Sequence, residues 1–208
     1  MNAKDYPEDF PDKLDYALHT LSPTQRAAFE SWASKQERGS MCDSIIYSSV
    51  MGSIFASMPA LDTHVVVFDT EITDLTEACR QDPVDMLFGV QLGGGTDINK
   101  SVAYCQTLIE NPRKTMFILI SDLYEGGVRS GLLRRLNEMH QDGVKVLVLL
   151  ALSDSGRPDY DEKLGKEISK LGIACFACTP DRLPELVENA LKGNDLKKFE
   201  SKNNETIN

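Results

Sequence analysis

Positive charge is scarce in this chain of 208 residues, where 22 Lys and Arg stand against 32 Asp and Glu, a formal net charge of −10. Nucleic-acid binding needs clustered basic side chains, so this balance argues against a nucleic-acid partner. The longest apolar run, VKVLVLLAL, is far too short to cross a membrane. The acidic start MNAKDYPEDFPDKLDY lacks the apolar centre of a signal peptide. We therefore expect a cytoplasmic protein whose five cysteines are reduced.

Composition changes along the chain predict one folded unit with extensions at both ends. Residues 1–21 are rich in Asp, Pro and Tyr and predict an acidic extended arm. Residues 22–38 predict a helix that begins with the N-cap Ser22 followed by a proline. Residues 193–208 are polar and predict a disordered tail. The remaining segment, residues 39–192, is expected to form the domain.

Apolar runs alternate with amphipathic segments throughout that domain. Buried strands are expected at residues 63–70, 115–121, 144–152 and 173–179. Amphipathic helices are expected at residues 43–58, 84–88, 97–110, 130–140, 161–172 and 183–193. This alternation predicts the α/β class, with a doubly wound, mostly parallel sheet, right-handed crossovers and helices on both faces.

The loops that follow the predicted strands are acidic. They read FDTEITD, ISDLYEGG and LSDSGRPDYD, and in a doubly wound sheet such loops bind ligands. A glycine turn, GGGTD at residues 93–97, precedes one helix and would suit phosphate in another context. Because Asp97 stands where phosphate charge would collect, we expect a cation at this edge instead.

Thr96 and Asp122 are the first candidates for holding that cation. Thr96 lies on the glycine turn and Asp122 directly follows a predicted strand. A hydroxyl and a carboxylate are hard oxygen ligands, which suit Mg²⁺ or Mn²⁺ with retained waters. The plainer interpretation is a helix-capping Thr-Asp turn together with an ordinary aspartate at a strand end.

Four segments resemble the von Willebrand factor A domain, and more narrowly the cytoplasmic bacterial members that accompany MoxR-type AAA+ ATPases. They are GSMCDSIIYSSVMGSIFASM, THVVVFDTEITDLT, GVQLGGGTDINKSV and ILISDLYEGG, in this order. The resemblance implies a metal-ion-dependent adhesion site with Ser40, Thr96 and Asp122 as ligands, completed by a partner's carboxylate. It also implies an adaptor, not an enzyme, that links an AAA+ ATPase to client proteins.

The chain departs from that family's pattern at the first metal-binding loop. Where the family has Asp-x-Ser-Gly-Ser-Met, this chain reads QERGSM, so that Gln36 replaces the aspartate and Arg38 the first serine. The resemblance begins abruptly at Gly39. Just upstream, AFESWASKQ has a helical pattern where the family has its central first strand. We expect weak or lost metal binding and a sheet without its usual central strand.

A phosphohydrolase of the haloacid-dehalogenase type is the alternative from another functional class. That family uses an Asp-x-Asp-x-Thr loop after a strand, and Asp69, Glu71 and Thr73 match it except at Glu71. In this interpretation Asp69 is the nucleophile. The acidic pair expected beyond a later strand is absent, and GGGTD stays unexplained. An aspartate that satisfies backbone groups at a loop is the plainer interpretation.

Two further patterns are weighed against simple structural roles. Cys175 and Cys178, in CFAC, have the spacing of a redox pair or half a zinc site. They lie on a predicted buried strand and no second pair follows, so we expect small core residues. Three arginines lie in or next to the helix RSGLLRRLNEMH, which predicts a solvated face, with partner docking as the alternative.

Overall fold

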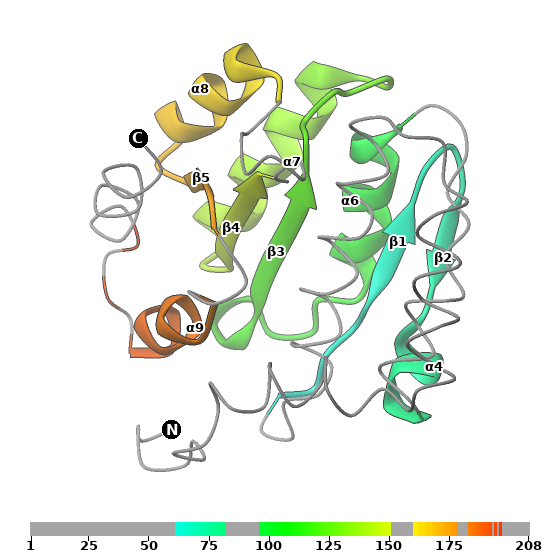
Figure 1. Cartoon of the computed structure of the whole chain (residues 1–208), viewed down its shortest axis with the longest axis vertical. Helices are drawn as coiled ribbons and strands as arrows, with labels where there is room; N and C mark the ends of the chain where they lie inside the picture. Colours follow the sequence, from blue (N-terminus) through cyan, green and yellow to red (C-terminus); the bar gives the residue numbers. More distant parts are fainter. Residues whose placement is uncertain are drawn as a thin grey trace, which may run out of the picture.

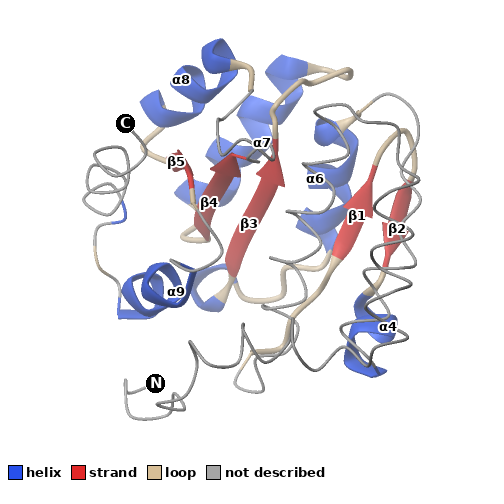
Figure 2. Ribbon diagram, in the orientation of Figure 1, coloured by secondary structure: helices blue, strands red, loops and turns tan. Residues whose placement is uncertain are grey.

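The computed structural model describes residues 61–81, 96–150, 160–178 and 183–192, together with residues 194 and 196 (Figure 1). The expected α/β class, with a parallel sheet packed by helices, is confirmed (Figure 2). The elements in chain order are β1 (Val66–Phe68), β2 (Ile72–Asp74), α4 (Thr76–Gln81), α6 (Ile98–Thr107), the 3-10 turn η2 (Pro112–Lys114), β3 (Met116–Ser121), α7 (Arg129–Gln141), β4 (Lys145–Leu150), α8 (Glu162–Lys170), β5 (Ala174–Ala177) and α9 (Leu183–Lys192).

Three parallel strands form the centre of the described structure. Their order is β3-β4-β5, and the register pairs Met116 with Lys145 and Leu147 with Ala174. Five of the six residues of β4 are buried, as its run of Val and Leu predicts for a strand covered on both faces. The three strands expected in this part of the chain are confirmed, although each is slightly shorter than the apolar run that predicts it.

The first strand differs from expectation in length, burial and partner. β1 covers three half-buried residues instead of a strand buried on both faces. It pairs antiparallel with β2, and the register joins Val66 to Asp74 and Phe68 to Ile72. The stretch FDTEITD, expected to be a ligand-binding loop, therefore contains a strand after a tight turn. The expectation was wrong because antiparallel strands can be joined by a very short hairpin, which a doubly wound pattern does not anticipate.

Within the described residues, the hairpin and the parallel strands form two separate sheets. β1 pairs with β2 and β3 pairs with β4, and no described strand lies between β1 and β3. Helix α6 packs against β1 and α7, and so connects the two sheets from behind (Figure 1). The segment AFESWASKQ, where the central strand was expected to be lost, lies outside the described residues.

Helices α6, α7 and α8 bury one face each, and α6 and α8 each begin with an aspartate N-cap. Ile98 and Val102 of α6 are fully buried, as their spacing predicts. On α7 the buried side chains Leu132, Leu136 and Met139 recur every three or four residues. Helix α8 is capped by Asp161, whose carboxylate accepts a hydrogen bond from Leu164 N. These faces join the sheet in one continuous core.

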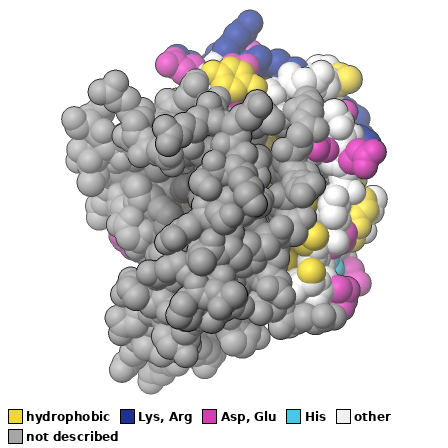
Figure 3. Space-filling model, turned by 45° about the vertical axis from the view of Figure 1, so that its right-hand side comes forward, with side chains coloured by type: hydrophobic (Ala, Val, Ile, Leu, Met, Phe, Trp, Pro, Cys, Tyr) yellow, Lys and Arg dark blue, Asp and Glu magenta, His cyan; other side chains and the backbone are white. Residues whose placement is uncertain are grey.

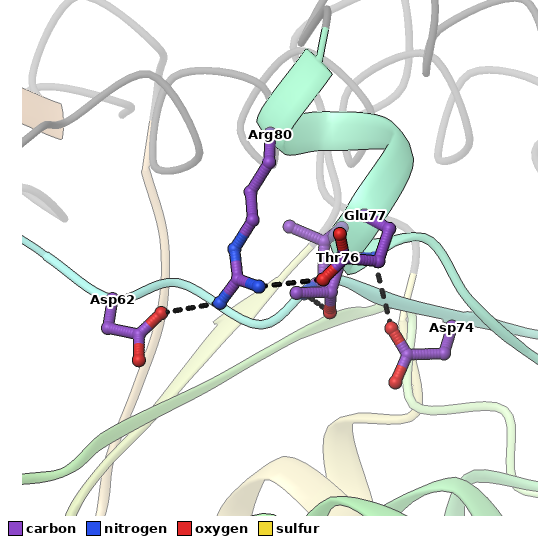
Figure 4. A network of polar contacts seen from close by, with 6 residues as sticks. Asp62, Asp74, Thr76, Glu77 and Arg80 are labelled. Atoms are coloured by element: carbon purple, nitrogen blue, oxygen red, sulfur yellow. Dashed lines mark hydrogen bonds and ion pairs between the residues drawn. The ribbon is translucent and has the colours of Figure 1, made fainter.

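A short helix that the sequence patterns did not predict, α4, follows the hairpin. Thr76 N donates to Asp74 Oδ1 at 2.9 Å, and Thr76 Oγ1 accepts from Val65 N at 3.1 Å. In Figure 4, Arg80 reaches from α4 to Glu77 and to Asp62, at 2.7 and 2.8 Å. A helix of six residues is too short to show a recurring pattern of apolar side chains in the sequence. Its polar contacts define it instead.

Several expected segments lie outside the described residues. They are the acidic arm at 1–21, the helices at 22–38, 43–58 and 84–88, Gly193 as the stop of α9, and the tail beyond it except two residues. Of those two, Asn194 N donates to Asn189 O at 3.0 Å and Leu196 packs against the main core, so the expected disorder does not extend to them. Those expectations remain predictions.

Replacing Leu136 with alanine should lower the free energy of unfolding by about 2–5 kcal/mol, because the change leaves a cavity between α7 and the sheet. Urea denaturation followed by far-UV circular dichroism measures it. The matched change Arg134→Ala removes an exposed ion pair with Glu138 and should cost less than about 0.5 kcal/mol. Equal losses in the two variants would contradict the placement of α7.

Stability should depend on the charge of Asp161 at acidic pH. Burial alone would raise the pKa of Asp161, but hydrogen bonds from Leu164 N and Arg129 outweigh it and hold the pKa below its ordinary value. The lowered pKa means that the charge stabilises the fold above the ordinary pKa and stops doing so as the pH falls through the lowered one. Asp161→Asn should cost about 1 kcal/mol at neutral pH. In thermal denaturation between pH 7 and pH 3, the difference in melting temperature between the unaltered chain and Asp161→Asn should vanish at the acidic end. A difference that stays constant with pH would contradict this role.

Candidate functional site

Backbone hydrogen bonds connect four loops at the carboxyl-terminal edge of the sheet. Asp97 N donates to Asp69 O at 3.0 Å, which joins the start of α6 to the hairpin turn. Gly126 N donates to Thr96 O at 2.7 Å, which joins α6 to the loop after β3. Asp161 N donates to Asp122 O at 3.0 Å, which joins that loop to the start of α8. Acidic segments that are far apart in the sequence thus meet at one edge.

Two of the three predicted metal ligands belong to these connected loops. Thr96 immediately precedes the N-cap of α6, and Asp122 directly follows β3. Both are partly buried, and Gly126, which binds the Thr96 carbonyl, lies four residues after Asp122. Ser40, Gln36 and Arg38 lie outside the described residues. The proposed ligand set therefore stays a prediction, with two of its members placed on hydrogen-bonded loops.

The chain leaves β3 through a tight turn around Asp122. Ser121 Oγ accepts from Leu123 N at 3.0 Å, and Asp122 Oδ1 accepts from Tyr124 N at 3.2 Å. Leu123 has a φ of 62°, in the left-handed region that non-glycine residues rarely enter, and its side chain is fully buried. These contacts direct the next residues toward the start of α6.

Asp97 caps the helix that follows the glycine turn, as its position predicts. Its Oδ1 accepts from Lys100 N at 2.8 Å, the usual geometry of an aspartate N-cap. The carboxylate thereby occupies the positive end of α6, where a phosphate would otherwise bind. This contact favours the interpretation of the turn as a capped helix start.

Glu125 is a member of this edge that the sequence analysis missed. Its Oε2 accepts from Asn99 N at 3.1 Å, and its Oε1 accepts from Gly127 N at 2.6 Å. Burial raises the pKa of Glu125, Asp97 adds to the rise, and the backbone donors only partly offset it. A capping group that comes from another loop leaves no spacing signal in the sequence. Glu125 thus holds the loop after β3 against the first turn of α6.

Two glycines allow this close approach. A Cβ at Gly126 would lie 2.6 Å from the Thr96 carbonyl oxygen, a backbone atom that cannot move aside. A Cβ at Gly127 would lie 2.5 Å from both Asp97 Oδ1 and Glu125 Oε1. Gly126 is therefore a steric requirement of the contact, whereas a side chain at Gly127 would force the carboxylates of Asp97 and Glu125 to shift.

The three arginines of α7 bind groups of the same chain. Arg129 contacts Asp161 at 2.9 Å and Glu167 at 3.2 Å, and so joins the starts of α7 and α8. Arg134 pairs with Glu138. Arg135 donates to Asn99 and Gln106 on α6. Arg129 and Arg135 thus hold helices together, a role that neither sequence interpretation anticipated, whereas the exposed Arg134 fits the expected solvated face.

The geometry around Asp69 offers no support for a phosphohydrolase. Asp69 Oδ1 accepts from Glu71 N at 2.7 Å, and Asp69 N donates to Glu71 O at 3.0 Å, so the pair forms the hairpin turn. Thr73 lies in β2 and is exposed. In this arrangement the aspartate satisfies backbone groups of the turn, which is the plainer interpretation of the motif.

Cys175 and Cys178 are buried members of the main core, as expected. Among the described residues, no group of three or more His, Cys, Asp and Glu side chains is arranged to hold a metal ion. The predicted site differs from such a group, because two of its three ligands, Thr96 and Ser40, would bind the ion through hydroxyl oxygens. Likewise, no described helix is long and apolar enough to cross a membrane.

Comparison with solved structures supports the fold. A protein titled BatB from Bacteroides thetaiotaomicron aligns over 72% of this chain and 87% of its own, with a TM-score of 0.50 and 14% identity. An aerotolerance-related membrane protein from Bacteroides fragilis NCTC 9343, carrying multiple mutations to serine, aligns over 74% and 88%, with a TM-score of 0.52 and 14% identity. At such low identity these neighbours bear on the fold alone.

Comparison of sequences identifies the family. The Escherichia coli (strain K12) protein YehP, which carries the description uncharacterized, is 44% identical over 154 residues. The match covers 74% of this chain and only 40% of that relative's length. A family model described as VWA domain containing CoxE-like protein matches residues 37–187. The chain therefore belongs to the CoxE-like proteins that contain a von Willebrand factor A domain.

Proposed function

We propose that this chain is a protein-interaction module, not an enzyme, and that it acts in the cytoplasm as an adaptor between a MoxR-type AAA+ ATPase and a client protein. Family membership supports the interaction role. The observation that carries the proposal is the hydrogen-bonded edge where the Thr96 and Asp122 loops meet. The described groups there cap helices and turns, as Asp97, Glu125 and Asp69 do, which favours a binding surface over a reaction centre.

We propose further that the metal site of this edge is impaired. Ser40, Thr96 and Asp122 would be the remaining ligands, and Mg²⁺ or Mn²⁺ the ion. Gln36 in place of aspartate removes a charged ligand from a site that depends on few ligands and retained waters. A guanidinium such as that of Arg38, about 4 Å from a divalent ion, would repel it by about 2 kcal/mol even with bulk-water screening.

Restoring the family motif should restore metal binding. The unaltered chain should bind Mg²⁺ and Mn²⁺ weakly or not at all in isothermal titration calorimetry. The double variant Gln36→Asp with Arg38→Ser should bind about thirtyfold more tightly, because about 2 kcal/mol of repulsion disappears and a carboxylate is added. Asp122→Asn in that variant should abolish the gain. Micromolar binding by the unaltered chain, one ion per chain, would contradict the impairment.

The adaptor role can be tested by complex formation. We expect the chain to co-purify with the MoxR-type AAA+ ATPase of the same organism when the two are co-expressed and ATP is bound. Asp122→Ala should weaken the complex, whereas Asp142→Ala, an exposed residue at the other end of α7, should leave it intact. No complex in any nucleotide state would contradict the ATPase partner. Hydrolysis of p-nitrophenyl phosphate that Asp69→Asn abolishes would contradict the non-enzymatic role.

A further inference from the structure

Two large hydrophobic side chains are exposed in the described part of the chain, and both lie on the loop after β3. Tyr124 is 50% exposed and Val128 is 59% exposed. They flank Glu125, Gly126 and Gly127, the segment that contacts the start of α6. Single exposed hydrophobic residues are ordinary on a protein surface. These two lie on one short loop at the candidate site, residues 122–128, which we name the rim loop.

The rim loop breaks two local rules of protein stability. Leu123 adopts a left-handed backbone conformation, which costs a residue with a Cβ about 1 kcal/mol or more. Val128 is the N-cap of α7, with φ −101° and ψ 92°, and supplies no side-chain hydrogen bond to the helix. Valine is among the poorest N-cap residues. Departures of this kind are expected where function opposes stability.

The rim loop is nevertheless held firmly in place. Gly126 N binds Thr96 O, Glu125 accepts from Asn99 N, and Asp122 O accepts from Asp161 N. The side chain of Leu123 is fully buried and anchors the loop in the main core. A partner that binds here therefore meets an ordered surface, and little conformational entropy is lost on association.

Among the described residues, the charges around the rim loop are mostly negative. The connected segments 69–71, 96–100, 122–129 and 160–162 contain two cations, Lys100 and Arg129, and seven carboxylates: Asp69, Glu71, Asp97, Asp122, Glu125, Asp161 and Glu162. Arg129 pairs with Asp161 and Glu167, and Lys100 donates to Thr70 O. Of the carboxylates, Glu162 pairs with Lys166. Figure 3 shows hydrophobic side chains beside both basic and acidic ones at the upper end of the molecule. A complementary partner carries positive charge.

We propose that Tyr124 and Val128 are the apolar anchors of a docking surface, and that its occupant is a partner-protein segment combining an apolar side chain with Arg or Lys. This rests on the proposed role as an interaction module and names the partner chemistry. Tyrosine is enriched among residues that dominate binding energy, and its ring face also attracts a guanidinium. The acidic edge selects a basic segment, and the rigid loop presents both anchors without reordering.

Fluorescence anisotropy with three short labelled peptides of equal length tests the surface. One peptide combines Leu with Arg, the second replaces Leu by Ser, and the third replaces Arg by Glu. The first should bind at least about tenfold more tightly than the others, and added salt should weaken it. Tyr124→Ser should weaken that binding at least about tenfold, while Tyr124→Phe, which keeps the ring, should retain it. Ala78→Ser, an exposed change on the distant α4, is the matched control (Figure 1).

Val128→Thr separates docking from a purely structural role, because the docking role predicts weaker binding in a variant whose fold is more stable. Threonine is a good N-cap, so the melting temperature should rise by about 2–4 °C. Binding of the Leu-Arg peptide should weaken about fivefold, since a hydroxyl replaces a methyl group at the anchor. Raised stability with unchanged binding would overturn the role of Val128 as an anchor.

The remaining outcomes each decide against the proposal. Tighter binding of the acidic peptide would overturn the partner chemistry, and so would no binding of any peptide. A self-association that Tyr124→Ser abolishes, measured by light scattering, would assign the surface to a second copy of the chain. If the ATPase complex forms and Tyr124→Ser leaves it intact while no peptide binds, the docking surface fails and the adaptor role stands. If the Leu-Arg peptide binds as expected and no ATPase complex forms, the ATPase partner fails and the surface stands.

Discussion

The arrangement of the candidate site depends on the hydrogen bond from Gly126 N to Thr96 O. It brings the loop after β3 against the first turn of α6, and Glu125 reinforces the contact by accepting from Asn99 N. The contact is tight enough that a Cβ at Gly126 would collide with the Thr96 carbonyl. Two segments that the sequence separates by some thirty residues therefore form one surface. Backbone atoms, more than particular side chains, set its geometry.

Long apolar runs made the centre of the fold predictable. The run VKVLVLLAL can only be buried on both faces, and β4 lies where that run predicts. Helices α7 and α8 were equally clear, because apolar residues recur at helical spacing and Asp161 and Gly172 mark the ends of α8. These features depend on neighbours close in the chain, which periodicity records well.

The parts that sequence patterns missed depend on contacts between distant segments. β2 has one half-buried residue and is a strand because β1 pairs with it. Helix α4 is defined by Thr76 and Arg80 contacts and has too few residues to show a period. Glu125 caps a helix of which it is not part. At the candidate site, the motifs indicated Thr96 and Asp122, but no pattern indicated the glutamate that holds their loops together.

Among the described residues, the two sheets bury very different amounts of apolar side chain, which has a consequence for how the molecule opens. Strands β3, β4 and β5 are consecutive in the chain and adjacent in the sheet, and they enclose most of the main core. This unit buries many fully enclosed side chains, so opening it exposes a large apolar area and costs more free energy than opening the hairpin. Its amides should form the slowest-exchanging group in native-state hydrogen exchange. The amides of the β1–β2 hairpin should exchange faster, because its two three-residue strands contain no fully buried side chain.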